Sequence, residues 1–144
     1  MLRLEPITPD NWREPLRVRE DQRAYVAEGA VLLARAYAYR EQRSQVRQIT
    51  AEGVPVGMVL WHDWPEGQCY MLSQLYIDQR YQGRGYGRAA SRLALDAMCA
   101  DGRYRRCELC YVAGDEPARR LYASLGFRPT GDRDEDEIVM ALTL

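Results

Sequence analysis

The chain has 144 residues, of which 47% are hydrophobic and 28% are charged, and its formal net charge is −1. This size and composition predict a single globular domain over residues 1–144, and the near-neutral charge gives no general attraction to nucleic acids, so any basic site must be local. Because no apolar run approaches the ~20 residues of a membrane span and the first residues lack a secretory signal, we expect a cytoplasmic protein without a nucleic-acid or membrane partner.

The first half of the chain reads as a strand, two helices and a pair of strands. The alternating segment LRLEPIT predicts a short strand. A stretch rich in helix formers follows and is punctuated by Pro15 and Gly29, which predicts two helices. Two further strands are expected around a tight turn at Glu52-Gly53. The expected ranges are about 10–21 and 22–39 for the helices and 44–64 for the strand pair.

Strands and helices alternate in the second half. A strand leads into a glycine-rich stretch, and the helix behind it is expected to end at Gly102. Its predicted apolar face consists of Ala89, Leu93, Ala97 and Ala100. The remaining segments predict strands at 69–78, 105–113, 127–131 and 137–144, and a helix at 115–127 capped by Asp115. The order β-α-α-β-β-β-α-β-α-β-β predicts an α/β fold, with a mixed central sheet of about seven strands and four helices.

Two of the four cysteines form a CxxC pair, Cys107 and Cys110. A zinc site needs further cysteines or histidines nearby, and the chain has one histidine, His62. The pair lies in a predicted strand, where residues three apart point to opposite faces. We therefore expect buried, reduced thiols and no metal site.

The stretch YIDQRYQGRGYGRAA concentrates glycine and positive charge between a predicted strand and a predicted helix. A helix N-terminus offers unpaired N–H groups, and glycines let the backbone approach a phosphate. Neither the P-loop pattern nor the dinucleotide pattern GxGxxG is present, and a purely structural turn with solvated arginines is the alternative. The residues concerned are Gly83, Gly85, Gly87, Arg80, Arg84 and Arg88.

The same stretch resembles a known family. QGRGYG, from Gln82 to Gly87, is similar to the (Q/R)xxGx(G/A) signature of the N-acetyltransferase (GNAT) family, and ARRLYASLGF is similar to that family's later helix. The resemblance covers nearly the whole chain and implies acetyl-CoA as cofactor. It also implies that a substrate amine attacks the thioester directly.

The resemblance assigns roles to the residues around the glycines. The backbone of Gln82, Gly83, Arg84, Gly85, Tyr86 and Gly87 would hold the pyrophosphate, with Arg88 beside it, and the main chain around Leu75, Tyr76 and Ile77 would pair with the pantetheine arm. The strands that end at Ile77 and Val112 would splay apart to admit that arm. Asp115 stands where the family usually has an asparagine that contacts the cofactor.

Acetyl transfer also needs proton transfer. The attacking amine must lose a proton, and the leaving thiolate is helped by a proton donor. Tyr122 is similar to the family's general-acid tyrosine, although a half-buried aromatic residue on an amphipathic helix is the simpler interpretation. The base is left open among Glu66, Asp63, His62, Glu108 and a water chain, and His62 is expected in a surface loop.

The segment before residue 40 resembles bacterial diamine/spermidine/spermine acetyltransferases, from Leu16 through Gln22 to Ala27. A polycation site needs carboxylates and aromatic faces, whereas most such charges are simply solvated. Glu20, Tyr25, Glu28 and Trp61 are the main candidates for binding the amine, with Asp21, Tyr37, Tyr39, Glu41 and Trp64 as further ones.

Three alternatives to a polyamine acetyltransferase remain at this point. The chain could acetylate another small amine or a peptide N-terminus, or it could bind acyl-CoA without turnover. A nucleic-acid binder is disfavoured by the net charge. The resemblance also implies a homodimer.

Overall fold

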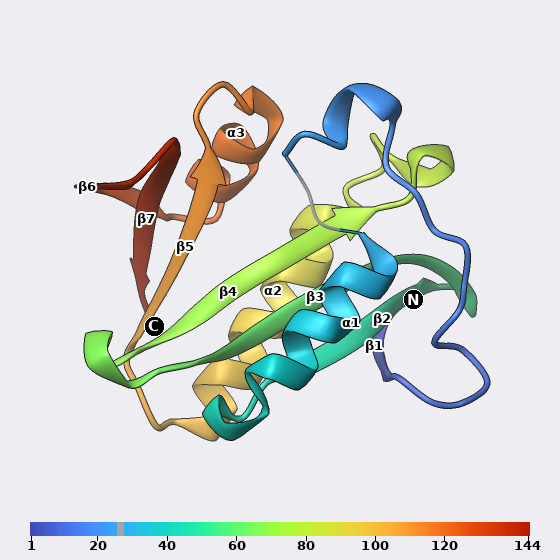
Figure 1. The fold of residues 1–144 in the computed structure, drawn as a ribbon, viewed down its shortest axis with the longest axis horizontal. Coiled ribbons are helices and arrows are strands. Elements are labelled where there is room, and N and C mark those ends of the chain that lie inside the picture. Colours follow the sequence, from blue (N-terminus) through green and yellow to red (C-terminus); the bar gives the residue numbers. More distant parts are fainter. Residues whose placement is uncertain (26–27) are drawn as a thin grey trace.

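Seven strands form one mixed sheet in the order β1-β2-β3-β4-β5-β7-β6, and the computed structural model that shows it describes residues 1–25 and 28–144 (Figure 1). Neighbouring strands are antiparallel except β4 and β5, which are parallel. The strands span Leu2–Pro6 (β1), Gln45–Ala51 (β2), Val54–Trp64 (β3), Cys69–Ile77 (β4), Arg106–Val112 (β5), Arg128–Asp134 (β6) and Glu137–Thr143 (β7). In the described residues, three α-helices accompany the sheet: Gly29–Ala38 (α1), Tyr86–Asp101 (α2) and Glu116–Ser124 (α3).

The predicted α/β class, the seven strands and the tight turn at Glu52-Gly53 are confirmed. Both turn residues have positive φ angles, 50° and 79°, as a two-residue hairpin turn requires. The two later helices are also where the sequence indicates. Asp115 caps α3 by accepting a hydrogen bond from the N–H of Ala118, and Gly102 ends α2 in the left-handed conformation.

The first predicted helix, over 10–21, is wrong. Residues 14–19 have no regular secondary structure, and a 3-10 turn (η1, Glu20–Gln22) follows. Leu16 and Val18 are both buried against α1, β3 and β4, and a spacing of two residues fits extended backbone. The second helix begins at Gly29 and not near 22, and residues 26 and 27 of that prediction lie outside the described residues. The sheet is therefore accompanied by three described helices in place of the predicted four.

The predicted apolar face of α2 is also wrong. Ala89, Ala97 and Ala100 are exposed, whereas the helix buries Ala90, Ser91, Ala94, Leu95 and Met98. Ser91 lies on the buried face because its hydroxyl donates to the carbonyl oxygen of Gly87 at 2.8 Å, which satisfies its polar group within the helix.

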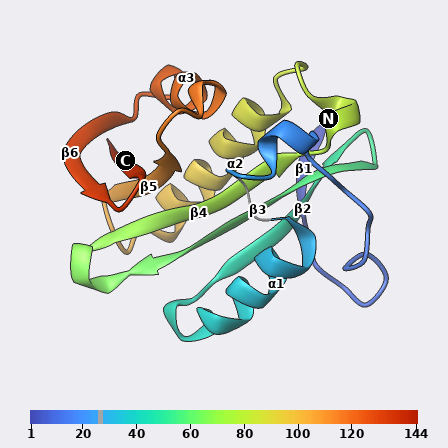
Figure 2. The same cartoon turned by 45° about the horizontal axis from the view of Figure 1, so that its top comes forward.

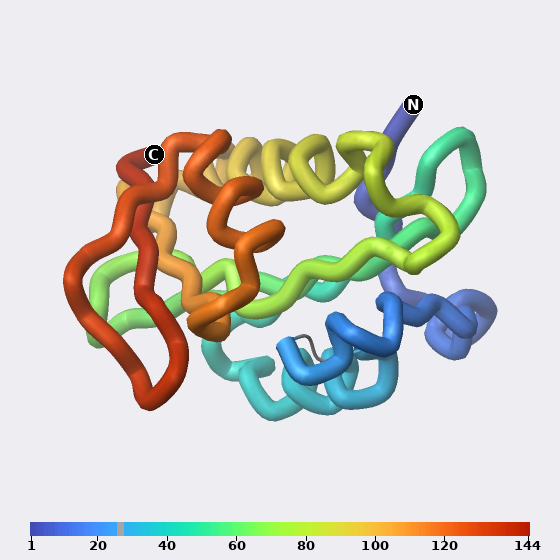
Figure 3. Tube along the Cα trace, turned by 90° about the horizontal axis from the view of Figure 1, so that it is seen from above, coloured from blue at the N-terminus to red at the C-terminus, as the bar shows by residue number. Residues whose placement is uncertain are grey.

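The two longer helices cover opposite faces of the sheet (Figure 3). α2 packs over a core that contains Ile49, Val59 and Leu72, and α1 covers a smaller cluster around Leu32 and Leu60. Within residues 1–25 and 28–144, no helix is long and apolar enough to cross a membrane.

The strands β4 and β5 separate along the sheet. They pair at only two positions, Tyr70 with Cys107 and Met71 with Glu108, and diverge beyond them (Figure 1). In β4, Ser73 is an extra residue in the register with β3, which is a bulge that bends the strand. The splay predicted from the family resemblance is thus present, and α3 and η1 lie on either side of its mouth (Figure 2).

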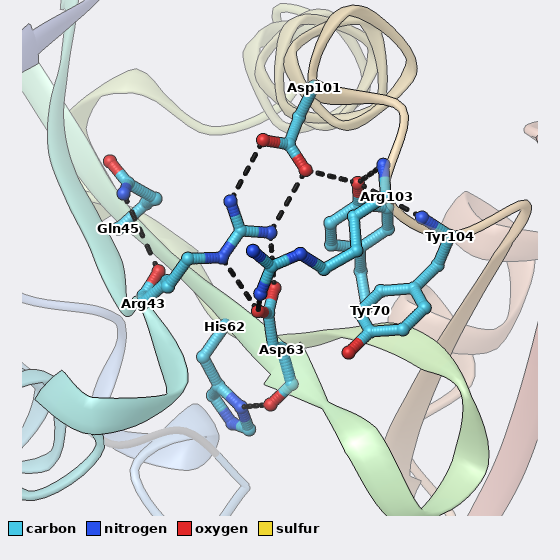
Figure 4. Close-up of polar contacts among 8 residues, drawn as sticks. All are labelled: Arg43, Gln45, His62, Asp63, Tyr70, Asp101, Arg103 and Tyr104. Carbon is cyan, nitrogen blue, oxygen red and sulfur yellow. Dashed lines mark hydrogen bonds and ion pairs between the residues drawn. The ribbon is translucent and has the colours of Figure 1, made fainter.

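A network of ion pairs holds the opposite, closed end of this opening (Figure 4). The guanidinium of Arg43 binds the Asp63 carboxylate at 2.7 and 2.9 Å and the Asp101 carboxylate at 2.9 and 3.0 Å. Arg103 donates a further bond to Asp63, and the Tyr70 hydroxyl donates to Asp101. The network joins β3, β4 and the end of α2 where β4 and β5 still pair.

The cysteine pair is arranged as predicted for a strand. Cys107 is buried in the core under α2, whereas Cys110 is half-buried on the other face. All four cysteines are free, so the expectation of burial for the pair holds for Cys107 and only in part for Cys110.

Candidate active site

A cavity of roughly 410 Å³ lies between the end of β4, the glycine stretch, the start of α2 and α3. It brings together most of the residues predicted for the cofactor. These lining residues are Leu75, Tyr76, Ile77, Gln82, Gly83, Gly85, Tyr86, Gly87, Arg88 and Asp115.

The glycine stretch has the backbone geometry of an anion-binding turn. Gly83 and Gly85 have φ angles of +78° and +82°, which residues with a Cβ rarely adopt. Gly85 is also the N-cap of α2, and its carbonyl oxygen accepts the first helical bond from the N–H of Ala89. The first turn of α2, whose N–H groups have no partner within the helix, therefore lies in the cavity wall, an arrangement that suits a phosphate group.

Asp78 anchors this turn, and sequence reasoning missed it. Its carboxylate accepts from the backbone N–H of Arg17 at 2.9 Å and from the backbone and side chain of Arg80. Burial acts to raise the pKa of Asp78, but these hydrogen bonds outweigh it, and the net pKa is lowered. The signal in the sequence was an acidic residue directly before the turn at Gln79–Tyr81 (η4), which it caps.

Gln82 ties the turn to its neighbours with its side chain. Its amide nitrogen donates to the carbonyl oxygen of Ile77 at 2.9 Å and to the side chain of Gln22 at 2.8 Å. Gln22 belongs to η1, so this bond links the N-terminal segment to the cavity wall. Gln82 therefore has a positioning role through its side chain.

The three arginines near the glycines have different surroundings. Arg88 lines the cavity, and its guanidinium lies 3.4 Å from the Ser124 hydroxyl. Arg80 binds Asp78, and Arg84 lies over the ring of Tyr81 and does not line the cavity. The structure thus brings Arg88, and not Arg84, into the predicted cofactor cavity.

A narrow cleft of roughly 60 Å³ continues from this cavity between β4 and β5. Tyr122 and Asp115 line both spaces. The Tyr122 ring packs edge-on against Phe127, with ring centroids 5.9 Å apart. Burial, and then the Asp115 carboxylate, raise the pKa of Tyr122 well above its usual range. Tyr122 is therefore a protonated hydroxyl at the point where β4 and β5 separate.

Asp115 combines its capping role with a place in the cleft wall. Burial raises its pKa, although the hydrogen bond from the Ala118 N–H acts in the opposite direction. The neighbouring Gly114 has a φ of +101°, which lets the chain turn into α3.

A third cavity, of roughly 270 Å³, opens on the α1 face of the sheet and contains His62. The prediction of a surface-loop histidine is wrong, because His62 is buried in β3 and stacks on Tyr39 with ring centroids 4.3 Å apart. Its Nδ1 donates to the carbonyl oxygen of Asp63 at 2.7 Å. Burial lowers the pKa of His62 and favours the neutral ring. Trp64, Arg35 and Glu137 also line this cavity.

The other candidate bases lie elsewhere. Asp63 is held by Arg43 and Arg103 at the closed end of the strands (Figure 4). Glu66 is exposed on the hairpin turn after β3, and Glu108 pairs with Arg106 at 3.0 Å. None of these carboxylates lines the three cavities described here.

The residues predicted to bind the amine do not lie together in the structure. Tyr25 lines the cleft, whereas Glu20 is exposed on η1. Glu28 accepts from the N–H of Val18 at 2.7 Å and thereby holds the start of α1. Trp61 is buried on the α2 face of the sheet, opposite the α1-side cavity, because its position in β3 alternates with that of His62.

Comparison with known proteins agrees with this geometry. The sequence pattern of the acetyltransferase (GNAT) family matches residues 5–127. A spermine/spermidine N(1)-acetyltransferase of Bacillus subtilis (strain 168) is 25% identical over 142 positions, covering 92% of this chain and 91% of that protein.

Two solved structures share the fold over nearly the whole chain. Spermidine N-acetyltransferase from Vibrio cholerae, in complex with CoA and spermine, has a TM-score of 0.78 at 17% identity and covers 99% of this chain and 95% of its own. The ribosomal-protein-S18-alanine N-acetyltransferase from Escherichia coli has a TM-score of 0.74 at 21% identity, with 99% and 94% covered.

The chain belongs to the acetyltransferase (GNAT) family, whose sequence pattern it matches. The structure agrees, because the strands β4 and β5 splay apart beside a glycine turn at the N-terminus of α2. The chain is an acetyl-CoA-dependent N-acetyltransferase, and acetyl-CoA is its acyl donor.

Proposed function

We propose that this enzyme transfers the acetyl group of acetyl-CoA to a primary amine of a polyamine such as spermidine or spermine, by direct attack of the amine on the thioester. The observation that carries the proposal is the continuity of the three cavities. The glycine-turn cavity and the cleft share Tyr122, and the cleft and the α1-side cavity share Glu137. An acyl donor and an amine can therefore approach the cleft from opposite sides.

The residues fit the donor. The glycine turn and Arg88 suit a pyrophosphate, because the turn supplies backbone N–H groups at a helix N-terminus. The main chain of β4 around Leu75, Tyr76 and Ile77 lies beside the opening, free of β5, and can pair with the amides of an extended pantetheine arm. Tyr122 lines the place to which such an arm leads.

The chemistry needs a proton donor for the departing thiolate and N–H donors for the carbonyl oxygen of the thioester. Tyr122 is protonated and reaches the cleft, which suits the first role. The strand β4 suits the second, because its backbone beyond Met71 is not paired with β5.

The polyamine assignment has separate support. The α1-side cavity combines the aromatic faces of Tyr39 and Trp64 with the Glu137 carboxylate, a combination that suits an amine carrying positive charges. The Bacillus subtilis relative is named a spermine/spermidine N(1)-acetyltransferase. We further propose a cytoplasmic homodimer, for which the unpaired edges of β1 and β6 offer pairing surfaces.

The test is thiol release from acetyl-CoA in the presence of single amines, with the acetylated product identified by mass. The panel contains spermidine, spermine, putrescine, aminoglycosides, amino acids and a peptide with an N-terminal alanine. We expect turnover with spermidine and spermine. The peptide is included because an alanine N-acetyltransferase shares the fold with a TM-score of 0.74.

Each other outcome has a defined meaning. Turnover confined to the peptide or another amine would keep the reaction and reject the polyamine. Binding of acetyl-CoA, measured by calorimetry, without turnover on any amine would contradict the proposed substrate class and favour a non-catalytic acyl-CoA-binding module.

A further inference from the structure

Glu137 occupies the start of β7, directly across from the end of β5. Its Cα pairs with that of Val112 in the antiparallel register, and Cys110 pairs two positions along with Val139. The alternation of a strand places Glu137 and Cys110 on the α1 face, whereas Leu109 and Tyr111 enter the core under α2. Glu137 is half-buried there.

This position is the junction of the cleft and the α1-side cavity. The two spaces share five residues: Leu72, Ser73, Gln74, Cys110 and Glu137. Glu137 is the one carboxylate among these described residues. Tyr122 lines the same cleft from α3, so an acyl group placed in the cleft would have Tyr122 and Glu137 in its walls.

The other groups near this junction that could take a proton are less suited to do so than Glu137. Cys110 stays a neutral thiol, because burial and the carboxylates of Glu137 and Asp134 raise its pKa to about 11. Asp115 lines the cleft but not the α1-side cavity, and it caps α3. His62 lines the α1-side cavity but not the cleft that contains Tyr122.

We propose that Glu137 binds the ammonium group of the acceptor amine and takes the proton that must leave before the nitrogen attacks. The inference rests on the proposed function and names the catalytic base that the sequence left open. Glu137 is the carboxylate that lines the α1-side cavity, together with the aromatic residues Tyr39 and Trp64 and the guanidinium-bearing Arg35.

The proton and electron balance is complete. One proton of the ammonium passes to the Glu137 carboxylate and then to water, and the neutral nitrogen forms a bond to the thioester carbon. The carbon–sulfur bond breaks, the sulfur leaves with the electron pair, and Tyr122 gives it a proton. The Tyr122 oxygen recovers a proton from the nitrogen. The products are an amide, the CoA thiol and one released proton.

The local environment brings the two pKa values closer together. Burial, and then the carboxylates of Asp134 and Asp136, raise the pKa of Glu137, while Arg35 acts to lower it. A desolvated ammonium has a lowered pKa, so transfer from it to Glu137 is less unfavourable than in water. The charged and titratable groups on the surrounding elements are Asp134, Glu135 and Asp136 beside β7, Cys110 on β5, Arg35 on α1, His62 on β3, and Tyr25, Tyr39, Asp115 and Tyr122 around the two spaces.

The test replaces Glu137 with glutamine, which keeps its size and removes both charge and basicity. With spermidine at pH 7, we expect kcat to fall on the order of a hundredfold, the usual effect of losing a general base, with an unchanged KM for acetyl-CoA. The matched control, Glu14→Gln, makes the same change at an exposed residue that lines none of the three cavities, and it should keep kcat within about twofold.

The pH profile separates a base from a merely structural residue. Wild-type activity should rise as Glu137 ionises and then level off. In Glu137→Gln the amine must arrive already neutral, so activity should keep rising roughly tenfold per pH unit up to about pH 10, near the pKa of a free alkylamine. Glu137→Asp should keep the wild-type shape at a lower kcat, and it serves as the test if the glutamine variant does not melt cooperatively.

The failure of this inference differs from a failure of the proposed function. If none of the amines in the panel causes wild type to release thiol from acetyl-CoA, the proposed function is wrong, whatever the role of Glu137. If wild type is active and the glutamine variant keeps its kcat and its pH profile, or the aspartate variant acquires the steep rise, Glu137 is not the base although the enzyme acetylates amines.

Discussion

Tyr122 lies on α3 and lines both the glycine-turn cavity and the cleft between β4 and β5. Burial and the nearby Asp115 carboxylate both favour its neutral form, so its pKa is raised and it carries its proton throughout the neutral range. A phenol in that state can donate to a departing thiolate without a preceding ionisation step.

Replacing Tyr122 with phenylalanine removes the hydroxyl and keeps the ring contact with Phe127. We expect kcat to fall on the order of tenfold to a hundredfold, because the proton donor is lost, while the KM for acetyl-CoA and the Tm stay near wild type. Steady-state thiol release measures the rates. Tyr37→Phe, which removes an exposed hydroxyl on α1, is the control. Equal loss in both variants would argue against a role for Tyr122 as the acid.

The sequence located some of these residues and missed others for a physical reason. Tyr122 and Gln82 lie in contiguous motifs, so a local pattern could find them. Glu137 and Asp78 act through contacts with segments far away in the chain, such as the bond from Arg17 to Asp78. The face on which Trp61 lies could not be predicted, because strand alternation does not by itself say which side chains of a strand face the core under α2.

At the scale of elements, α2 has a left-handed glycine at each end. Gly85 begins it with a φ of +82°, and Gly102 ends it with a φ of +72°. A Cβ added at Gly85 meets no atom within 4 Å, and one at Gly102 meets only the Cys99 carbonyl oxygen at 3.8 Å. The two positions therefore impose a similar backbone strain and differ in their distance from the donor cavity.

Alanine at either position should lower the free energy of unfolding by about 1 to 2 kcal/mol, the cost of a left-handed conformation for a residue with a Cβ. Only Gly85→Ala should also weaken acetyl-CoA binding, by roughly tenfold if about 1.4 kcal/mol of backbone–phosphate interaction is lost. Chemical denaturation and calorimetry measure the two effects. An equal loss of affinity in Gly102→Ala would show that strain in α2, and not contact with the donor, sets the affinity.

Elements were easier to predict than their faces or ends. Strands and the two later helices have strong local signals: alternation, an Asp cap and terminal glycines. The segment 10–21 has helix-forming residues, but its backbone is used elsewhere: the N–H of Arg17 donates to Asp78, and its carbonyl oxygen accepts from the N–H of Gln79. Tertiary contacts therefore override local propensity in this segment.

At the scale of the whole molecule, the Arg43 network fixes the closed end of the sheet opening. Hydrogen bonds from Arg43 and then Tyr70 hold the pKa of Asp101 well below its usual range, so the unfolded state binds more protons than the folded state in acid. The stabilisation is present above the ordinary carboxylate pKa of about 4 and is lost as the pH falls below it.

Asp101→Asn should therefore flatten the acid limb of the stability curve. The free energy of unfolding of wild type should fall between about pH 4 and pH 2 more steeply than that of the variant, because the variant has no Asp101 carboxylate to protonate. Urea unfolding at a series of pH values measures both slopes. Asp96→Asn, which changes an exposed carboxylate on the same helix, should keep the wild-type slope. Identical slopes for wild type and Asp101→Asn would show that the network carries no linked protonation.

The two-pair junction between β4 and β5 also bears on how long the protein lasts in a cell. The proposed pairing of the pantetheine arm with β4 would give this interrupted sheet a further strand-like partner. A ligand that binds only the folded state adds about 2.7 kcal/mol of stability at a hundred times its Kd. Because proteases act on the unfolded fraction, the abundance of this enzyme would follow the supply of its own acyl donor.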